Sequence, residues 1–130
     1  MEINHPERQR DLDLIRLILL DLAGYGVPET ELRKYTPDQL ALHGAYLKDA
    51  GFVHANISDE NGVPKAVGYI RLTWQGHEFV ELSRENEAWQ KSKDALMAAG
   101  VWNVALLSDL LRDAAKERLR QPGTTIVTGS

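Results

Sequence analysis

The side chains that could carry out chemistry are few, and none stands in a known catalytic or metal-binding pattern. The histidines lack the spacing of a zinc motif, although His43 and His54 could still meet in space. His77-Glu78 has no adjoining nucleophile or phosphate loop. The absence of cysteine excludes thiolate ligands and disulfides. We therefore expect no enzyme active site, no metal ion and no cofactor.

A second set of side chains has the types that contact DNA. A helix over residues 37–50 is expected to expose several of them, and a following β-hairpin carries the others. Amide and ammonium groups on such a helix can reach base edges or phosphates. The predicted DNA contacts are Gln39, His43, Tyr46, Lys48, Lys65 and Arg71.

The charge of the chain supports a competing interpretation, in which this helix is an ordinary amphipathic one. The net charge is −4, and Asp38 and Asp49 accompany the basic residues of helix 37–50. Phosphate neutralisation supplies much of the affinity for DNA, so a DNA-binding helix is usually richer in Arg and Lys. Both interpretations remain open from the residues alone.

Hydrophobic spacing predicts the first element, a helix over residues 8–23. Leu12, Ile15 and Leu19 form one apolar stripe, and Leu14 and Leu17 belong to a second. A helix this apolar needs cover on two sides. We expect its own domain to cover one side, and the C-terminal helices or a second subunit to cover the other.

Local signals predict a short strand at residues 31–35 and then the helix over 37–50. Thr36 is a suitable N-cap, and Pro37 suits the first helical position. Leu40, Leu47 and Ala50 are expected on the inner side of this helix, which Gly51 ends in a left-handed conformation.

Alternating residues predict a β-hairpin with strands at 52–57 and 67–72. Ile70 and Leu72 are expected to face inward. The predicted connection, residues 58–64, contains the turn signal Asn61-Gly62 and is longer than a tight hairpin needs, which suits an exposed wing.

Three further helices are expected after the hairpin. Thr73 caps the first, Asn86 caps the second, which Gly100 ends, and the third spans residues 103–120. We expect Trp74, Trp89 and Trp102 in the core, with Trp102 alternatively an exposed anchor. The predicted fold class is α+β, in the order helix, strand, helix, β-hairpin, helix. The predicted divisions are a domain at 8–85, a helical extension at 86–120 and a flexible tail at 121–130.

Two runs of residues resemble parts of winged-helix domains. Leu47-Lys48-Asp49-Ala50-Gly51-Phe52-Val53 is similar to the junction between the recognition helix and the wing. Tyr69-Ile70-Arg71-Leu72-Thr73-Trp74-Gln75-Gly76 is similar to the junction between the wing and the next helix. The chain also resembles an uncharacterised family of short bacterial and prophage proteins. It does so through the run Arg10–Arg16, His43, the run Leu72–Phe79 and Trp89.

This resemblance, over roughly residues 8–120, implies a winged helix-turn-helix fold and no activity. The chain departs from that fold at one place, because only about eleven residues separate Gly24 from Thr36. We expect that to be too few for a strand and a support helix, so the helix-turn-helix would be truncated.

The sequence thus predicts a DNA-binding or transcription-regulating winged-helix protein of phage or mobile-element type. The alternative is a protein-interaction module on the same scaffold, for example an inhibitor that binds a host protein. A homodimer through helices 8–23 and 103–120 is a further hypothesis. No stretch approaches the roughly 20 apolar residues that span a bilayer. We therefore expect a cytoplasmic protein with no membrane partner.

Overall fold

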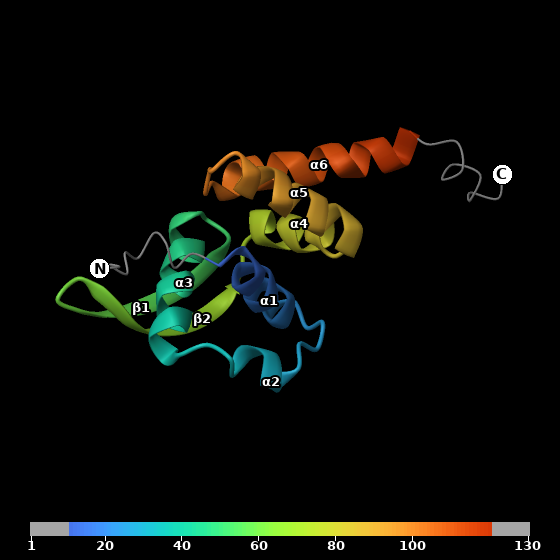
Figure 1. The fold of residues 1–130 in the computed structure, drawn as a ribbon. Helices are drawn as coiled ribbons and strands as arrows, with labels where there is room; N and C mark the ends of the chain where they lie inside the picture. The colour runs from blue at the N-terminus through green and yellow to red at the C-terminus, as the bar shows by residue number, and fades with distance from the viewer. Residues whose placement is uncertain (1–10, 121–130) are drawn as a thin grey trace. The chain divides into compact units, whose positions relative to one another are not determined.

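The computed structural model describes residues 11–120, which contain six helices and one β-hairpin (Figure 1). The start of the predicted first helix, residues 8–10, and the predicted tail at 121–130 lie outside the described residues. The elements are α1 (Leu12–Leu22), α2 (Glu29–Leu32), α3 (Pro37–Asp49), β1 (Val53–Glu60), β2 (Val63–Leu72), α4 (Trp74–Ser83), α5 (Asn86–Ala98) and α6 (Val104–Arg120).

Contacts divide the chain into two compact units, Met1–Val80 and Glu81–Ser130, which we describe separately. The division falls within α4, and the domain boundary at residue 85 stays a prediction. The structure confirms the α+β class. The first unit has an arrangement compatible with a winged-helix-like domain.

The first helix is present but begins at Leu12, because Asp11, expected within the helix, is its extended N-cap with φ −121°. The Asp11 carboxylate accepts a hydrogen bond from the Leu14 N–H at 3.1 Å, which satisfies one of the free donors of the first turn. Its buried apolar side chains are Leu12, Leu14, Ile15, Ile18 and Leu19.

The predicted strand at residues 31–35 is wrong, because the chain there forms the single helical turn α2. Pro28 precedes this turn with φ −61°, which suits a helix entry. Arg33 pairs with Glu29 at 3.0 Å along the turn. The segment between Gly24 and Thr36 was expected to be too short for both a strand and a support helix, and it contains one helical turn and no strand. α2 is only four residues long.

The structure confirms α3, together with the signals predicted at its two ends. The Thr36 hydroxyl accepts from the Gln39 N–H at 3.1 Å, and the Gln39 side chain accepts from the Thr36 N–H at 2.8 Å. This capping box satisfies two backbone donors reciprocally. Gly51 follows α3 with φ +80°. Ala50 was expected inside but is exposed, because the buried side of α3 runs along Ala41, His43, Gly44 and Leu47.

The hairpin is longer and its turn is tighter than predicted. Asn61 and Gly62 alone form the turn, with φ of 54° and 80°, so residues expected in a loop belong to the strands. Positive φ at both central positions matches the twist of paired strands. Figure 1 shows the hairpin extending past α3.

A shift in strand register explains a second difference in the hairpin. His54 pairs with Arg71, but Ala55 pairs with Tyr69, so Ile70 is the extra residue of a β-bulge. Such a residue leaves the strict alternation of faces. Ile70, expected to face inward, is therefore 60% exposed.

The second unit contains α5 and α6. Glu85 rather than Asn86 caps α5, accepting from the Ala88 N–H at 2.8 Å, and Asn103 caps α6. Trp89 and Leu96 of α5 are buried, as are Leu107 and Leu111 of α6.

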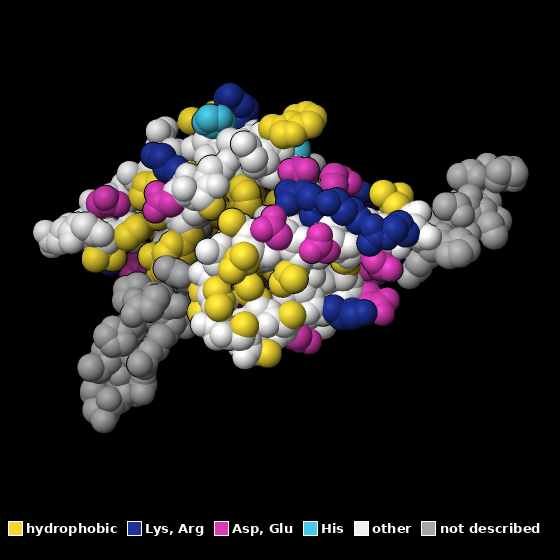
Figure 2. Space-filling model, turned by 90° about the horizontal axis from the view of Figure 1, so that it is seen from above, with side chains coloured by type: hydrophobic (Ala, Val, Ile, Leu, Met, Phe, Trp, Pro, Cys, Tyr) yellow, Lys and Arg dark blue, Asp and Glu magenta, His cyan; other side chains and the backbone are white. Residues whose placement is uncertain are grey.

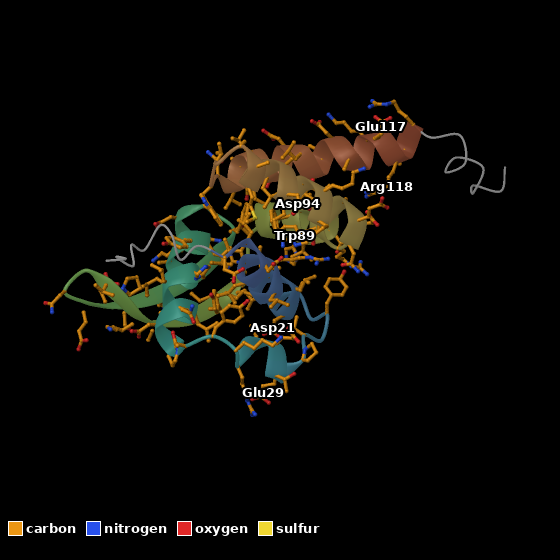
Figure 3. The ribbon with its side chains drawn as sticks, in the orientation of Figure 1. Asp21, Glu29, Trp89, Asp94, Glu117 and Arg118 are labelled. Atoms are coloured by element: carbon orange, nitrogen blue, oxygen red, sulfur yellow. The ribbon has the colours of Figure 1, made fainter. Side chains whose placement is uncertain are left out.

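An ion pair also links two segments of the second unit. Arg118 of α6 lies 3.6 Å from Glu85. Figure 3 shows Arg118 and Glu117 on opposite sides of α6.

The described residues lack both a membrane-crossing helix and a metal-binding cluster. None of their helices has the length and apolar character to cross a membrane. They also contain no group of three or more His, Cys, Asp or Glu residues that could hold a metal ion.

Candidate interaction surface

His43 was expected to be exposed, but its side chain is completely buried. Its Nε2 accepts a hydrogen bond from the Asp11 N–H at 2.8 Å. Its Nδ1 lies 2.8 Å from the Gln39 carbonyl, so Nδ1 carries the proton of the neutral ring. The Nε2 bond joins the start of α1 to α3, and the Nδ1 bond lies within α3, so both ring nitrogens are used. The side chain has no free group to offer to DNA.

The cluster around His43 also includes Tyr35, which follows α2. The Tyr35 hydroxyl donates to the Asp11 carboxylate at 3.2 Å. Burial lowers the pKa of His43, against smaller raising effects of the Gln39 carbonyl and the Asp11 charge. Burial and the neighbouring Asp11 raise the pKa of Tyr35 to about 12. This cluster therefore connects the start of α1, the residue after α2 and α3 by hydrogen bonds, and its role is structural.

Three more of the predicted DNA contacts are engaged within the chain itself. The Gln39 side-chain oxygen belongs to the capping box. The Lys65 ammonium pairs with the Asp38 carboxylate at 3.2 Å, so its charge is partly neutralised. Tyr46 is half-buried and packs edge-on against His43, with the ring centroids 5.4 Å apart.

The outward stripe of α3 is poorly suited to a phosphate backbone. Opposite the buried side, at helical spacing, lie Asp38, Leu42, Ala45 and Asp49. The two carboxylates at the ends are exposed, and the two apolar side chains between them are half-exposed. Lys65 pairs with Asp38, but Asp49 forms no ion pair with another described residue, so the end of this stripe would repel a phosphate backbone.

Lys48 and Arg71 are the predicted contacts that stay available. Both are exposed, and neither forms an ion pair with another described residue. They are placed at the end of α3 and near the end of β2, respectively. The Gly51 carbonyl accepts a hydrogen bond from Thr73 at 2.6 Å, so the ends of α3 and β2 lie close together.

Trp74 is the most exposed large hydrophobic side chain among the described residues, at 82%. It was expected in the core, and this expectation is wrong. The inward side of α4 is set by Gly76, Phe79 and Val80, which are buried. Because helical residues are about 100° apart, Trp74 cannot share that side with them. The same periodicity could have indicated its exposure from the sequence.

The backbone that carries Trp74 is held rigidly. The Thr73 hydroxyl accepts from the Gly76 N–H at 3.0 Å, and the Thr73 N–H donates to the Phe52 carbonyl at 3.0 Å. At Gly76, a Cβ would lie only 2.1 Å from that same carbonyl oxygen, so only glycine permits this approach. Phe52 and Phe79 pack with ring centroids 5.1 Å apart beneath it. The structure thus fixes the position from which the indole projects.

Other exposed side chains lie within a few residues of Trp74 in the chain or are paired with such residues across the hairpin. The β-bulge turns Ile70 outward next to Arg71, and His54 lies across the hairpin from Arg71. His77 follows Trp74 at helical i, i+3 spacing and is exposed as well. We name this set, consisting of His54, Ile70, Arg71, Trp74 and His77, the Trp74 surface.

A comparison with protein-family models identifies one match. Residues 9–102 match the family described as "Hypothetical protein (DUF2513)". The chain belongs to this family. The match ends within the connection between α5 and α6, and it includes all of the Trp74 surface. No curated protein and no solved structure matches the chain.

The charge distribution of the two units bears directly on DNA binding. Within residues 11–80 there are six Lys and Arg against ten Asp and Glu, a net charge of −4. Residues 81–120 have seven of each and no net charge. The negative charge of the chain therefore falls in the unit that was expected to bind DNA.

Proposed function

We propose that this protein is a protein-interaction module built on a winged-helix-like scaffold, with Trp74 as its anchor. The observation that carries the proposal is the 82% exposure of an indole on a segment whose backbone is locked. Tryptophan is enriched among the residues that dominate binding energy at protein interfaces. A rigid position reduces the entropy lost when a partner binds.

The charge and contacts of the first unit support a protein partner over DNA. The net charge of residues 11–80 is −4, and the outward stripe of α3 begins and ends with carboxylates. Buried His43 and ion-paired Lys65 remove two of the predicted DNA contacts from use. We place the module and its partner in the cytoplasm.

A DNA-binding regulator of phage or mobile-element type is the second candidate function. Lys48 and Arg71 favour it, because both are exposed and free of ion pairs among the described residues. On this alternative, a gel shift with random duplex at low salt detects a complex that raised salt dissolves. Lys48→Glu would weaken that complex. An absent shift at low salt removes this candidate.

Site-specific crosslinking in cells tests the protein-interaction proposal. A photoreactive amino acid is placed at position 74, and in separate variants at position 65 near the hairpin turn and at position 102. The expected result is one discrete crosslinked protein, identified by mass spectrometry, from position 74 and not from position 65. A uniform smear from all three positions, or no crosslink at position 74, contradicts the proposal.

We also propose that the second unit pairs with a second copy of the chain. Met97, Trp102 and Leu106 are exposed around the connection between α5 and α6. Figure 2, which looks onto α6 from above Figure 1, shows hydrophobic side chains gathered near its start. Two copies of a unit whose residues 81–120 have no net charge can meet without net repulsion. The apolar side chains of α1 are mostly buried, so we assign this contact to α6 rather than to helix 8–23.

A further inference from the structure

We infer that the Trp74 surface binds a partner segment in which a carboxylate lies beside an apolar side chain. This inference rests on the proposed function and names the chemistry of the partner. Two kinds of exposed group, one apolar and one cationic, carry it.

The apolar part of the surface consists of Trp74 and Ile70, which are 82% and 60% exposed. They belong to consecutive elements and are separated by only three residues, and the β-bulge turns Ile70 away from the core. A pair of exposed apolar side chains at fixed positions offers an apolar partner residue a place to lose its water.

The cationic part consists of Arg71, with Lys48 beyond it. Arg71 lies next to Ile70 in the chain, and its guanidinium forms no ion pair with another described residue. The 2.6 Å bond from Thr73 to the Gly51 carbonyl brings the end of α3, with Lys48, toward the start of α4. A guanidinium can bind a carboxylate through two parallel hydrogen bonds.

Three other cations of this unit differ from Arg71 and Lys48. Arg33, Lys34 and Lys65 each pair with a carboxylate of the chain itself. Arg71 and Lys48 have no carboxylate partner among the described residues, although this unit has more carboxylates than cations. Glu78 lies one helical turn after Trp74, but another interaction already engages it. The complement of this surface is therefore acidic and apolar.

A peptide titration of the full chain tests the inference. The probe is a short fluorescent peptide in which Asp or Glu alternates with Leu, and the matched peptide has Lys in place of each acidic residue. Anisotropy should detect binding of the acidic peptide and not of the basic one. Trp74→Ala should weaken binding by about 30-fold, the scale of an interface anchor, and Arg71→Glu by about tenfold.

Lys65→Glu is the matched charge control, because Lys65 is already paired and lies near the hairpin turn. It should leave the affinity for the acidic peptide unchanged. Thermal unfolding of each variant checks that the fold persists. If Trp74→Ala does not fold, the loss of peptide binding in Arg71→Glu still tests the inference.

The outcomes separate this inference from the proposed function. If the acidic peptide fails to bind while crosslinking at position 74 still captures a protein, the partner chemistry is wrong and the module remains. If crosslinking fails too, both are wrong. The inference is overturned if the acidic and basic peptides bind equally well. It is also overturned if Lys65→Glu weakens binding of the acidic peptide as much as Arg71→Glu does, or if Trp74 binds single-stranded DNA instead of the peptide.

Discussion

His43 shows how a single side chain changes the interpretation of a helix. The side chain occupies a helix expected to contact DNA, but it accepts the Asp11 N–H at 2.8 Å and is fully buried. A buried ring with both nitrogens satisfied stabilises the fold, because loss of either partner leaves a polar group without a hydrogen bond. The residue thus links α1 to α3 rather than reaching outward.

The stability of the chain should depend on pH through His43. Burial places its folded pKa below the value of about 6.5 expected for the unfolded chain. As the pH falls below about 6.5, the unfolded chain takes up a proton that the folded chain resists, so the free energy of unfolding decreases. Above that pH this contribution is fully present.

Urea denaturation at about pH 7.5 and about pH 5.5 measures this dependence. His43→Gln removes the titrating group, so its stability should change less between the two pH values. If the free energy of unfolding decreased equally in the parent and in His43→Gln, groups other than His43 would cause the pH dependence.

The hydroxyls of Tyr35 and Tyr69 form a matched pair for a second test. The Tyr69 hydroxyl is buried without a hydrogen-bond partner among the described residues, and burial raises its pKa to about 12. The Tyr35 hydroxyl donates to Asp11. Tyr69→Phe should leave the free energy of unfolding unchanged or raise it by up to about 1 kcal/mol, whereas Tyr35→Phe should lower it by about 1 kcal/mol.

Chemical denaturation of the two variants at neutral pH provides the measurement. A Tyr69→Phe protein clearly less stable than the parent would show that this hydroxyl has a partner in solution.

At the scale of elements, the contact between α4 and the chain just before β1 decides where Trp74 projects. Gly76 lies against the Phe52 carbonyl, and Thr73 bonds to both Gly51 and Phe52. Short elements are positioned by such contacts rather than by their own helical or strand preference.

Glycine substitutions test this contact. In Gly76→Ala, the new Cβ would lie 2.1 Å from a backbone oxygen that cannot move freely. The substitution should destabilise the fold by about 2–3 kcal/mol. Gly68→Ala in β2 is the control, since nothing lies within 4 Å of its added Cβ. Thermal or urea unfolding compares them, and equal stability of both variants would contradict the close approach.

At the scale of the whole molecule, charge and apolar surface are divided between the two units. The first unit has a net charge of −4 and the Trp74 surface, and residues 81–120 have no net charge and an apolar end. Because the two surfaces are separate, a substitution on one should abolish partner binding without affecting self-association, and a substitution on the other should do the reverse.

Self-association is tested by light scattering during size-exclusion chromatography. The chain should elute as a dimer at high concentration, and Leu106→Glu should make it monomeric by burying an unpaired charge in the contact. Ile70→Glu places the same charge on another exposed apolar residue and should leave the dimer intact. A monomer at every concentration refutes the pairing.

Much of the secondary structure could be predicted from the sequence, because its signals are local. The Thr36 cap, the positive φ of Gly51 and the turn at Asn61-Gly62 each depend on a few adjacent residues. Residues 31–35 could not be assigned, since so short a segment has no periodicity that separates a helical turn from a strand.

The candidate site depended on contacts that no local pattern contains. Whether His43 is buried depends on Asp11, which lies 32 residues earlier in the chain. Whether Lys65 is free depends on Asp38, and whether Ile70 faces inward depends on the register of β1 against β2. The sequence determined the elements and the total charge, since both follow from neighbouring residues and composition. Only the tertiary structure decided which side chains remain exposed, because burial results from packing between distant segments.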